Sequence, residues 1–188
     1  HSYRCRVRGF ESHSALTPRG VNAIEYAAAV IVKLRAMANQ KCDGGPYDRE
    51  FDVPYTTIHT GVIRGGTQLN IVPKDCEFIF EFRHLPQDDP AALFAEIKSY
   101  AETALEPEMR EVASDAGFSW ERMTVIPGLD TAEEEAVTTF TKGLTGANST
   151  AKVAFGTEAG LFQKSGIPTI ICGPGGIEQA HKPNEDIA

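Results

Sequence analysis

The stretch that decides the fold is residues 76–83, which read CEFIFEFR. One set of alternate side chains is apolar and includes three phenylalanines, whereas the other set carries Glu77, Glu81 and Arg83. Because successive side chains of a strand point to opposite faces of its sheet, this pattern predicts a strand with one buried face and one wet face. Such strands are typical of antiparallel sheets that pack against a core on one side only.

The sequence on either side of this strand predicts a complete sheet with two helices. Alternating or β-branched runs predict further strands at residues 3–10, 55–63 and 118–126. Apolar residues at helical spacing predict a helix over about residues 20–38, with Asn22 as a cap, and a second helix that begins at Asp89-Pro90. The order strand, helix, strand, strand, helix, strand predicts an α+β fold over residues 1–126. We expect a ferredoxin-like arrangement, which is a four-stranded antiparallel sheet with two helices on one face.

The last third of the chain, residues 127–188, has a different character. We expect helices after Thr131 and after Thr157, and short strands near Val153 and over residues 168–172. Alternating helices and strands are typical of a parallel α/β sheet, but about 60 residues cannot cover both faces of one. We therefore expect this segment to be the end of a larger α/β domain. The chain also opens with His1 rather than Met, which indicates a fragment or a processed chain.

Composition argues against several classes of function. The 188 residues include 26 acidic and 18 basic side chains, and the net charge of −8 makes nucleic acid and anionic membranes poor partners. The longest apolar run, residues 26–32, is too short to span a bilayer. No Cys-x-x-Cys pair is present, which favours reduced thiols in a cytoplasmic protein. We expect Cys5, Cys76 and Cys172 in the core and Cys42 in a loop.

Two histidines are candidates for chemistry on position alone. His13 lies in a polar loop before the first helix, and His181 follows a glycine-rich loop after a predicted strand, where open α/β sheets bind ligands. The simpler alternatives remain open, namely a loop histidine with local hydrogen bonds and a surface histidine. One histidine cannot hold a metal without further ligands. Residues 133–135, three glutamates, fit the solvated first turn of a helix better than a metal site.

Three separated motifs, in order, resemble the M20 family of zinc aminoacylases and peptidases. The first motif is GFESHS at residues 9–14. The second combines GGT at 65–67, NIVP at 70–73 and FR at 82–83. The third combines GTEA at 156–159, GPG at 173–175 and QAHKPNE at 179–185, and it is most similar to the branch that deacetylates N-acetylornithine. The resemblance covers nearly the whole chain.

The resemblance implies a division of labour along the chain. Residues 1–126 would be a lid that is also the dimerisation domain, and residues 127–188 would be the end of the zinc-binding α/β domain that contains it. The implied reaction is hydrolysis of an N-acyl amino acid by a homodimer with two zinc ions, or cobalt in their place. The family's other metal ligands and its general base have no match in this chain, so we expect the chain alone to be inactive.

The resemblance also implies roles for individual residues. His13 would stabilise the oxyanion in the active site of the partner subunit, and His181 would be a metal ligand. Asn70 and Arg83 match positions that hold the substrate carboxylate, and a guanidinium suits that group as a two-pronged donor. From the pattern alone, Arg83 could instead form only a surface salt bridge with a neighbouring acid.

Four further assignments stay open in the sequence. Gly173 and Gly175 could present backbone donors to the substrate, and Glu158 could face the substrate amine or merely cap its helix. The substrate could be another acyl amino acid, as for a succinyl-diaminopimelate desuccinylase or a carboxypeptidase. The ferredoxin-like part could also serve only as a non-enzymatic dimerisation module.

Overall fold

The structure, a computed structural model, describes residues 1–173. The chain forms two compact units. Unit 1 comprises His1–Val125 together with Lys152–Ala154, and unit 2 comprises Ile126–Ala151 and the residues from Phe155 onward.

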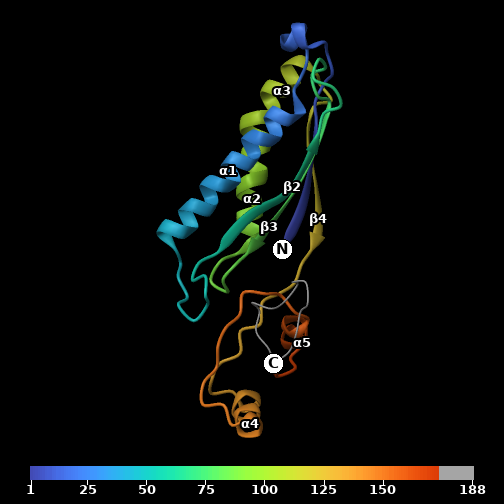
Figure 1. Cartoon of the computed structure of the whole chain (residues 1–188). Helices are drawn as coiled ribbons and strands as arrows, with labels where there is room; N and C mark the ends of the chain where they lie inside the picture. The colour runs from blue at the N-terminus through green and yellow to red at the C-terminus, as the bar shows by residue number, and fades with distance from the viewer. Residues whose placement is uncertain (174–188) are drawn as a thin grey trace. The chain divides into compact units, whose positions relative to one another are not determined.

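Unit 1 is built on a four-stranded antiparallel sheet (Figure 1). Its spatial order is β2-β3-β1-β4, and the strands are β1 (Ser2–Arg8), β2 (Thr57–Gly65), β3 (Asp75–Arg83) and β4 (Gly117–Thr124). Every neighbouring pair is antiparallel. β3 confirms the prediction for residues 76–83, because its cysteine and three phenylalanines are buried while Glu77, Glu81 and Arg83 alternate with them.

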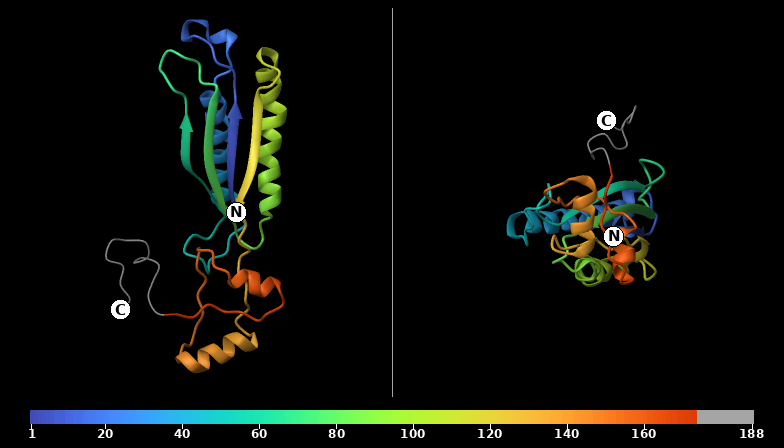
Figure 2. Two further views of the ribbon diagram at one scale, coloured as in Figure 1. Left: turned by 90° about the vertical axis from the view of Figure 1, so that its right-hand side faces the viewer. Right: turned by 90° about the horizontal axis from the view of Figure 1, so that it is seen from below.

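Two helical segments cover one face of this sheet (Figure 2). α1 (Ala23–Gly44) begins after Asn22, whose side-chain oxygen accepts hydrogen bonds from two first-turn amides at 3.0 and 3.3 Å. α2 (Pro90–Tyr100) begins after Asp89, which accepts a hydrogen bond from a first-turn amide at 2.8 Å. The predicted α+β fold is therefore confirmed. No helix among the described residues is long and apolar enough to cross a membrane.

The second predicted helix is interrupted. α2 runs into a π-helical turn, η2 (Ala101–Leu105), and then into α3 (Glu106–Val112). Pro107 accounts for the irregular turn, because proline has no amide hydrogen and its ring clashes with the carbonyl four residues earlier. The apolar stripe continues across the interruption, so Ala101 and Met109 both remain buried.

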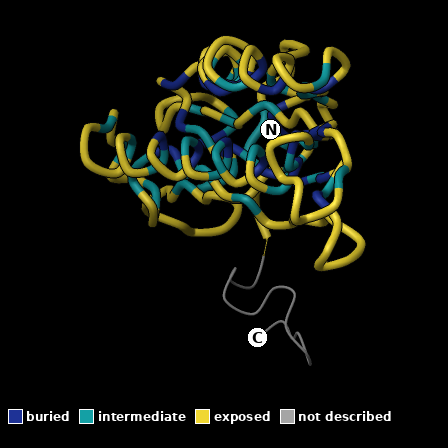
Figure 3. Tube along the Cα trace, turned by 90° about the horizontal axis from the view of Figure 1, so that it is seen from above, coloured by how far each residue is buried: buried dark blue, intermediate teal, exposed yellow. Residues whose placement is uncertain are grey.

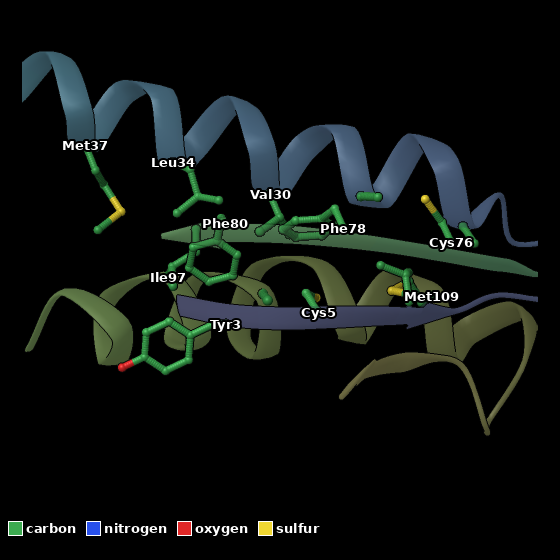
Figure 4. Close-up of a cluster of buried hydrophobic side chains, with 14 of the residues drawn as sticks. Tyr3, Cys5, Val30, Leu34, Met37, Cys76, Phe78, Phe80, Ile97 and Met109 are labelled. Carbon is green, nitrogen blue, oxygen red and sulfur yellow. The ribbon is translucent and has the colours of Figure 1, made fainter. Parts of the chain in front are cut away.

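The core of unit 1 lies between the helices and the sheet. Figure 4 shows Val30, Leu34 and Met37 of α1 pointing toward the strands, where they join one buried cluster with the phenylalanines of β3. Buried residues alternate with less buried ones along β1 and β3 and recur at helical spacing along α1. Figure 3 shows the buried residues interspersed with exposed ones along the trace. Cys5 and Cys76 are buried as predicted, and burial raises the pKa of both thiols, which keeps them protonated.

Unit 2 departs from the predicted alternation of helices and strands. Its helices are α4 (Ala136–Thr145) and α5 (Ala159–Lys164). The strands predicted near Val153 and over residues 168–172 do not form, because a strand needs a hydrogen-bonded neighbour and the described residues supply none there. The prediction that Cys172 is a core residue is wrong for the same reason, since no sheet formed by residues 1–173 covers it and it is exposed. Cys42, in contrast, is exposed as predicted.

Of the two helix caps predicted in unit 2, one is absent and the other is confirmed. Thr131 does not cap α4, because its hydroxyl donates to the carbonyl of Thr169 at 2.6 Å and the helix instead follows Glu135. The prediction for α5 is confirmed, since the Thr157 hydroxyl accepts a hydrogen bond from a first-turn amide at 3.2 Å. Gly166, with φ of 82°, follows the end of that helix in the left-handed conformation that glycine adopts readily.

Candidate functional site

Two loops meet at one end of the sheet in unit 1, which we call the tip. The first joins β1 to α1 and contains the 3-10 helix η1 (Ser14–Arg19), and the second joins β2 to β3 over residues 66–74. Figures 1 and 2 show both loops at the same end of the sheet. A groove of about 560 Å³ lies between them and the start of α1, and Ser14, Asn22 and Leu69 are among its lining residues. The tip therefore offers a cavity bordered by two loops.

Backbone hydrogen bonds hold the two loops of the tip together. The Val72 amide donates to the carbonyl of Ser12 at 2.8 Å, and the Ser14 amide donates to the carbonyl of Asn70 at 3.1 Å. His13 lies between these two bonds, in an isolated antiparallel bridge with the second loop. The fold thereby places the predicted residues His13 and Asn70 beside each other, although 57 residues separate them in sequence.

The side chains at the tip face outward. His13 and Asn70 are both exposed, and Leu69 is 100% exposed. The Nδ1 atom of His13 accepts a hydrogen bond from the Ala15 amide at 3.1 Å, so the histidine is also the N-cap of η1. The exposure of Leu69 could not be predicted from the sequence, because it depends on how the loop turns rather than on residue type.

Arg83 lies at the other end of β3, which we call the base. Asp75 and Arg83 are eight residues apart on the strand, and at about 3.3 Å per residue this amounts to about 26 Å. Asn70 precedes Asp75 and lies beyond the far end of the strand. The two residues predicted to hold one substrate carboxylate are therefore not brought together within a single chain.

Arg83 has partners at the base. Its Nε atom donates to Glu81 Oε1 at 2.9 Å, and its Nη1 atom donates to the carbonyl of Ala154 at 3.2 Å. The surface salt bridge that the sequence left open is thus present, although half of the Arg83 side chain remains exposed. The contact with Ala154 could not be predicted from the sequence, because it joins segments that are 71 residues apart.

Ion pairs hold residues 152–154 against the base. Lys152 Nζ lies 3.0 Å from Asp48 Oδ2 and 3.1 Å from Glu50 Oε2, and it stands 5.5 Å from the centre of the Phe51 ring. The Glu50 amide and then the Lys152 ammonium lower the pKa of the Asp48 carboxyl. The charged form of Asp48 is therefore favoured where it pairs with Lys152.

The predicted site residues of unit 2 are only partly described. Glu158 precedes α5 and is exposed, and its side chain makes no capping hydrogen bond, because Thr157 supplies the cap. The capping alternative for Glu158 is therefore wrong, and its contact with a substrate amine stays a prediction. Gly173 is the last described residue, whereas Gly175 and His181 lie outside the described residues. Over residues 1–173, no three His, Cys, Asp or Glu side chains come together to hold a metal ion.

Sequence comparison relates this chain to one family of hydrolases. Residues 1–109 match the peptidase dimerisation domain of the M20 family. The acetylornithine deacetylase of Myxococcus xanthus is 31% identical over 189 residues, which cover 95% of this chain and 45% of that protein. The acetylornithine deacetylase of Pectobacterium carotovorum is 33% identical, with coverage of 97% and 45%. The chain thus spans about 45% of the length of these curated relatives.

Structural comparison gives the same relationship. An aminopeptidase PepT from Bacillus cereus superposes with a TM-score of 0.64 at 27% identity, covering 89% of this chain and 41% of that one. A putative aminohydrolase from methicillin-resistant Staphylococcus aureus has a TM-score of 0.65 at 17% identity, covering 89% and 40%. At that lower identity the second likeness is one of fold alone.

Proposed function

The chain belongs to the M20 peptidase family, and from that premise we propose that it is part of a metal-dependent amide hydrolase that removes the acetyl group from N2-acetyl-L-ornithine, a step of arginine biosynthesis. The juxtaposition of His13 and Asn70 at the tip is the observation that carries the proposal. The names of the two curated relatives support the choice of substrate. A desuccinylase of succinyl-diaminopimelate and a carboxypeptidase are the alternatives within the same class of reaction.

The residues of the tip have a defined task in this reaction. Amide hydrolysis passes through a tetrahedral intermediate whose oxygen gains negative charge, and a preorganised donor stabilises that oxygen. We propose His13 as this donor, since its ring is exposed and its backbone is fixed on both sides. Asn70 and Arg83 would bind the substrate carboxylate, and Gly173, Gly175 and Glu158 would contact other parts of the substrate.

The separation between tip and base supports a site shared by two chains. Arg83 ends β3, whose length from Asp75 is about 26 Å, and Asn70 lies in the loop before the opposite end of that strand. A substrate the size of an N-acyl amino acid cannot touch both within one chain. We propose that each active site takes Arg83 from one chain and both His13 and Asn70 from the other, so that the homodimer is the catalytic form.

Strand β2 is the edge through which we propose that the lids pair. In the described sheet β2 bonds only to β3, which leaves a row of backbone groups available along its other side. Val62 and Ile63 on this strand are 37% and 50% exposed. An edge that is both apolar and unpaired is suited to association with a second copy, and the matched family domain is a dimerisation domain.

The proposed metal centre draws on residues beyond those described. The residues that the structure describes do not fit such a centre, because they contain no group of three suitable side chains. We propose His181 as one ligand for zinc, with two ions in each site and cobalt as an alternative. When bound, such an ion acts as a Lewis acid in amide hydrolysis.

A substrate panel tests the proposal. The dimeric protein that contains this chain, loaded with zinc, is expected to release acetate from N2-acetyl-L-ornithine faster than succinate from N-succinyl-diaminopimelate or amino acids from dipeptides. The 188-residue chain alone is expected to release none. Absence of turnover with every N-acyl amino acid and dipeptide would contradict an enzymatic role and favour a dimerisation module.

A further inference from the structure

We propose that the backbone amide of Ala15 is a positioning group that fixes the neutral His13 imidazole in its Nε2–H tautomer. The tautomer follows from the geometry of the tip alone, whereas its meaning for catalysis rests on the proposed function. The inference assigns which nitrogen of His13 meets the substrate, and it gives Ala15 a role that its side chain does not suggest.

The hydrogen bond within the first loop determines the tautomer. The Ala15 amide donates to Nδ1 of His13 at 3.1 Å. A neutral imidazole has one ring nitrogen that carries a proton and one that accepts. Because Nδ1 accepts the amide hydrogen, it cannot carry its own, and the proton of the neutral ring lies on Nε2.

The backbone around His13 keeps the ring in reach of that amide. The residue is extended, with φ of −65° and ψ of 141°, and it directly precedes η1. Its carbonyl accepts a hydrogen bond from the Leu16 amide at 2.7 Å, and the next amide, that of Ser14, is bonded to the second loop. The ring therefore caps η1 with Nδ1, while the side chain as a whole remains exposed.

The selected tautomer is the one that an oxyanion requires. A donor to the developing negative charge must present an N–H group to it. With Nδ1 occupied by the Ala15 amide, Nε2–H is the donor that remains free of η1. In the other tautomer, Nε2 would present a lone pair to the oxyanion, which is repulsive. The Ala15 amide thus removes the unproductive form before the substrate arrives.

Two substitutions of His13 separate the cap from the donor. The side-chain carbonyl of asparagine reaches the position of Nδ1 and is a good N-cap, but asparagine places no donor at the position of Nε2. The longer glutamine can place its NH₂ group near the position of Nε2, but it is a poorer cap. His13→Asn therefore tests the donor with the loop intact, and His13→Gln tests the donor with the cap weakened.

The first experiment needs no catalytic activity. The 188-residue chain is labelled with ¹⁵N at histidine, and its spectrum is compared with that of His13→Asn to assign the His13 signals. Above the pH at which the ring is charged, we expect Nδ1 of His13 to resonate in the unprotonated range and Nε2 in the protonated range. The reverse assignment, or an even mixture of the two tautomers, would overturn the proposal whatever the protein catalyses.

The second experiment measures the consequence in the dimeric protein loaded with zinc. Ala15→Pro removes the amide hydrogen at a position in the first turn, where proline is tolerated, and Ala15→Gly is the control that keeps it. We expect Ala15→Pro to lower kcat about 2- to 12-fold relative to Ala15→Gly, the range of one neutral hydrogen bond, with KM unchanged. Equal kcat values in the two variants would overturn the positioning role.

The asparagine and glutamine variants keep the two proposals distinguishable and cover the case in which Ala15→Pro does not fold. We expect His13→Asn to lose as much activity as His13→Ala, and His13→Gln to recover part of it. Full activity in His13→Asn would contradict the donor role in the proposed function, while the ¹⁵N spectrum would still decide the tautomer. Activity of His13→Gln no higher than that of His13→Asn would count against Nε2 as the donor.

Discussion

The tip and the base of unit 1 hold their polar residues in opposite ways. At the tip, backbone hydrogen bonds join the two loops, and the side chains of His13 and Asn70 are exposed. At the base, side chains make the connections, because Arg83 binds Glu81 and the carbonyl of Ala154, and Lys152 binds Asp48. One strand, β3, joins the two ends.

This difference indicates what each end is suited to do. Loops joined by their backbones leave side-chain groups such as the His13 Nε2 atom free to meet another molecule, even though Nδ1 of the same ring caps η1. An arginine that already has an ion pair is prepositioned, but part of its charge is compensated before a ligand arrives. This contrast agrees with our proposal that the tip reaches into another chain, whereas the base binds substrate in its own chain.

The largest effect is expected at the tip. His13→Ala should lower kcat on the order of 10²–10³-fold, because it removes the proposed oxyanion donor. Bound zinc, measured by metal analysis, should be unchanged, since His13 is not a proposed ligand. A loss of zinc in His13→Ala would assign the residue to the metal centre instead.

Mixed dimers test whether tip and base act in different chains. Subunits with His13→Ala are exchanged with subunits carrying Arg83→Ala, so each mixed dimer contains one site with both residues intact. With random exchange, about a quarter of the wild-type activity should return.

The matched control for this experiment mixes two tip variants, His13→Ala and Asn70→Ala. Both defects then fall on the residues donated by the tip, so every site in the mixed dimer lacks one of them and no recovery is expected. No recovery in either mixture after exchange has been verified would show that the tip does not act in trans. Equal recovery in the two mixtures would show that His13 acts in trans but that Asn70 comes from the chain that supplies Arg83.

A smaller effect is expected at the base. Arg83→Lys keeps the charge but loses the planar fork of the guanidinium. The transition-state stabilisation measured by kcat/KM for N2-acetyl-L-ornithine should therefore fall by about 1.5–3 kcal/mol, the value of a charged hydrogen bond. Replacing the substrate carboxylate by a neutral amide should make the loss much smaller. Glu81→Gln, which removes only the ion-pair partner, should leave kcat/KM nearly unchanged. Equal losses of kcat/KM on both substrates would indicate that Arg83 has only a structural role.

The fold of unit 1 could be predicted because its signals are local. The alternation at residues 76–83 and the caps at Asn22 and Asp89 each depend on a few neighbouring residues, and the structure confirms them. The interruption of the second helix was not predicted, because the apolar residues at helical spacing that indicated this helix lie before Pro107.

The fold of unit 2 was harder to predict from the sequence, because it depends on contacts between residues that are far apart in the chain. A strand over residues 168–172 depends on a partner strand, which no short sequence pattern can reveal. The prediction that Cys172 is buried failed for the same reason. For the candidate site, residue type and motif spacing indicated His13, Asn70 and Arg83. The distance between Asn70 and Arg83 became visible only when β3 was seen to lie between them.

The smallest effect compares the helix caps at the two ends. Asn22 caps α1 at the tip and lines its groove, whereas Asp89 caps α2 away from the tip. Asn22→Ala and Asp89→Ala should each lower the free energy of unfolding by about 1 kcal/mol, measured by urea denaturation, because each leaves first-turn amides without an acceptor. Asn22→Asp, which keeps the cap, should remain near the wild-type value. If the tip acts as a locally ordered unit, only Asn22→Ala should also lower kcat, by a few-fold, since a frayed start of α1 loosens the loop that carries His13. An equal loss of kcat in Asp89→Ala would mean that general loosening of the lid, rather than order at the tip, limits the reaction.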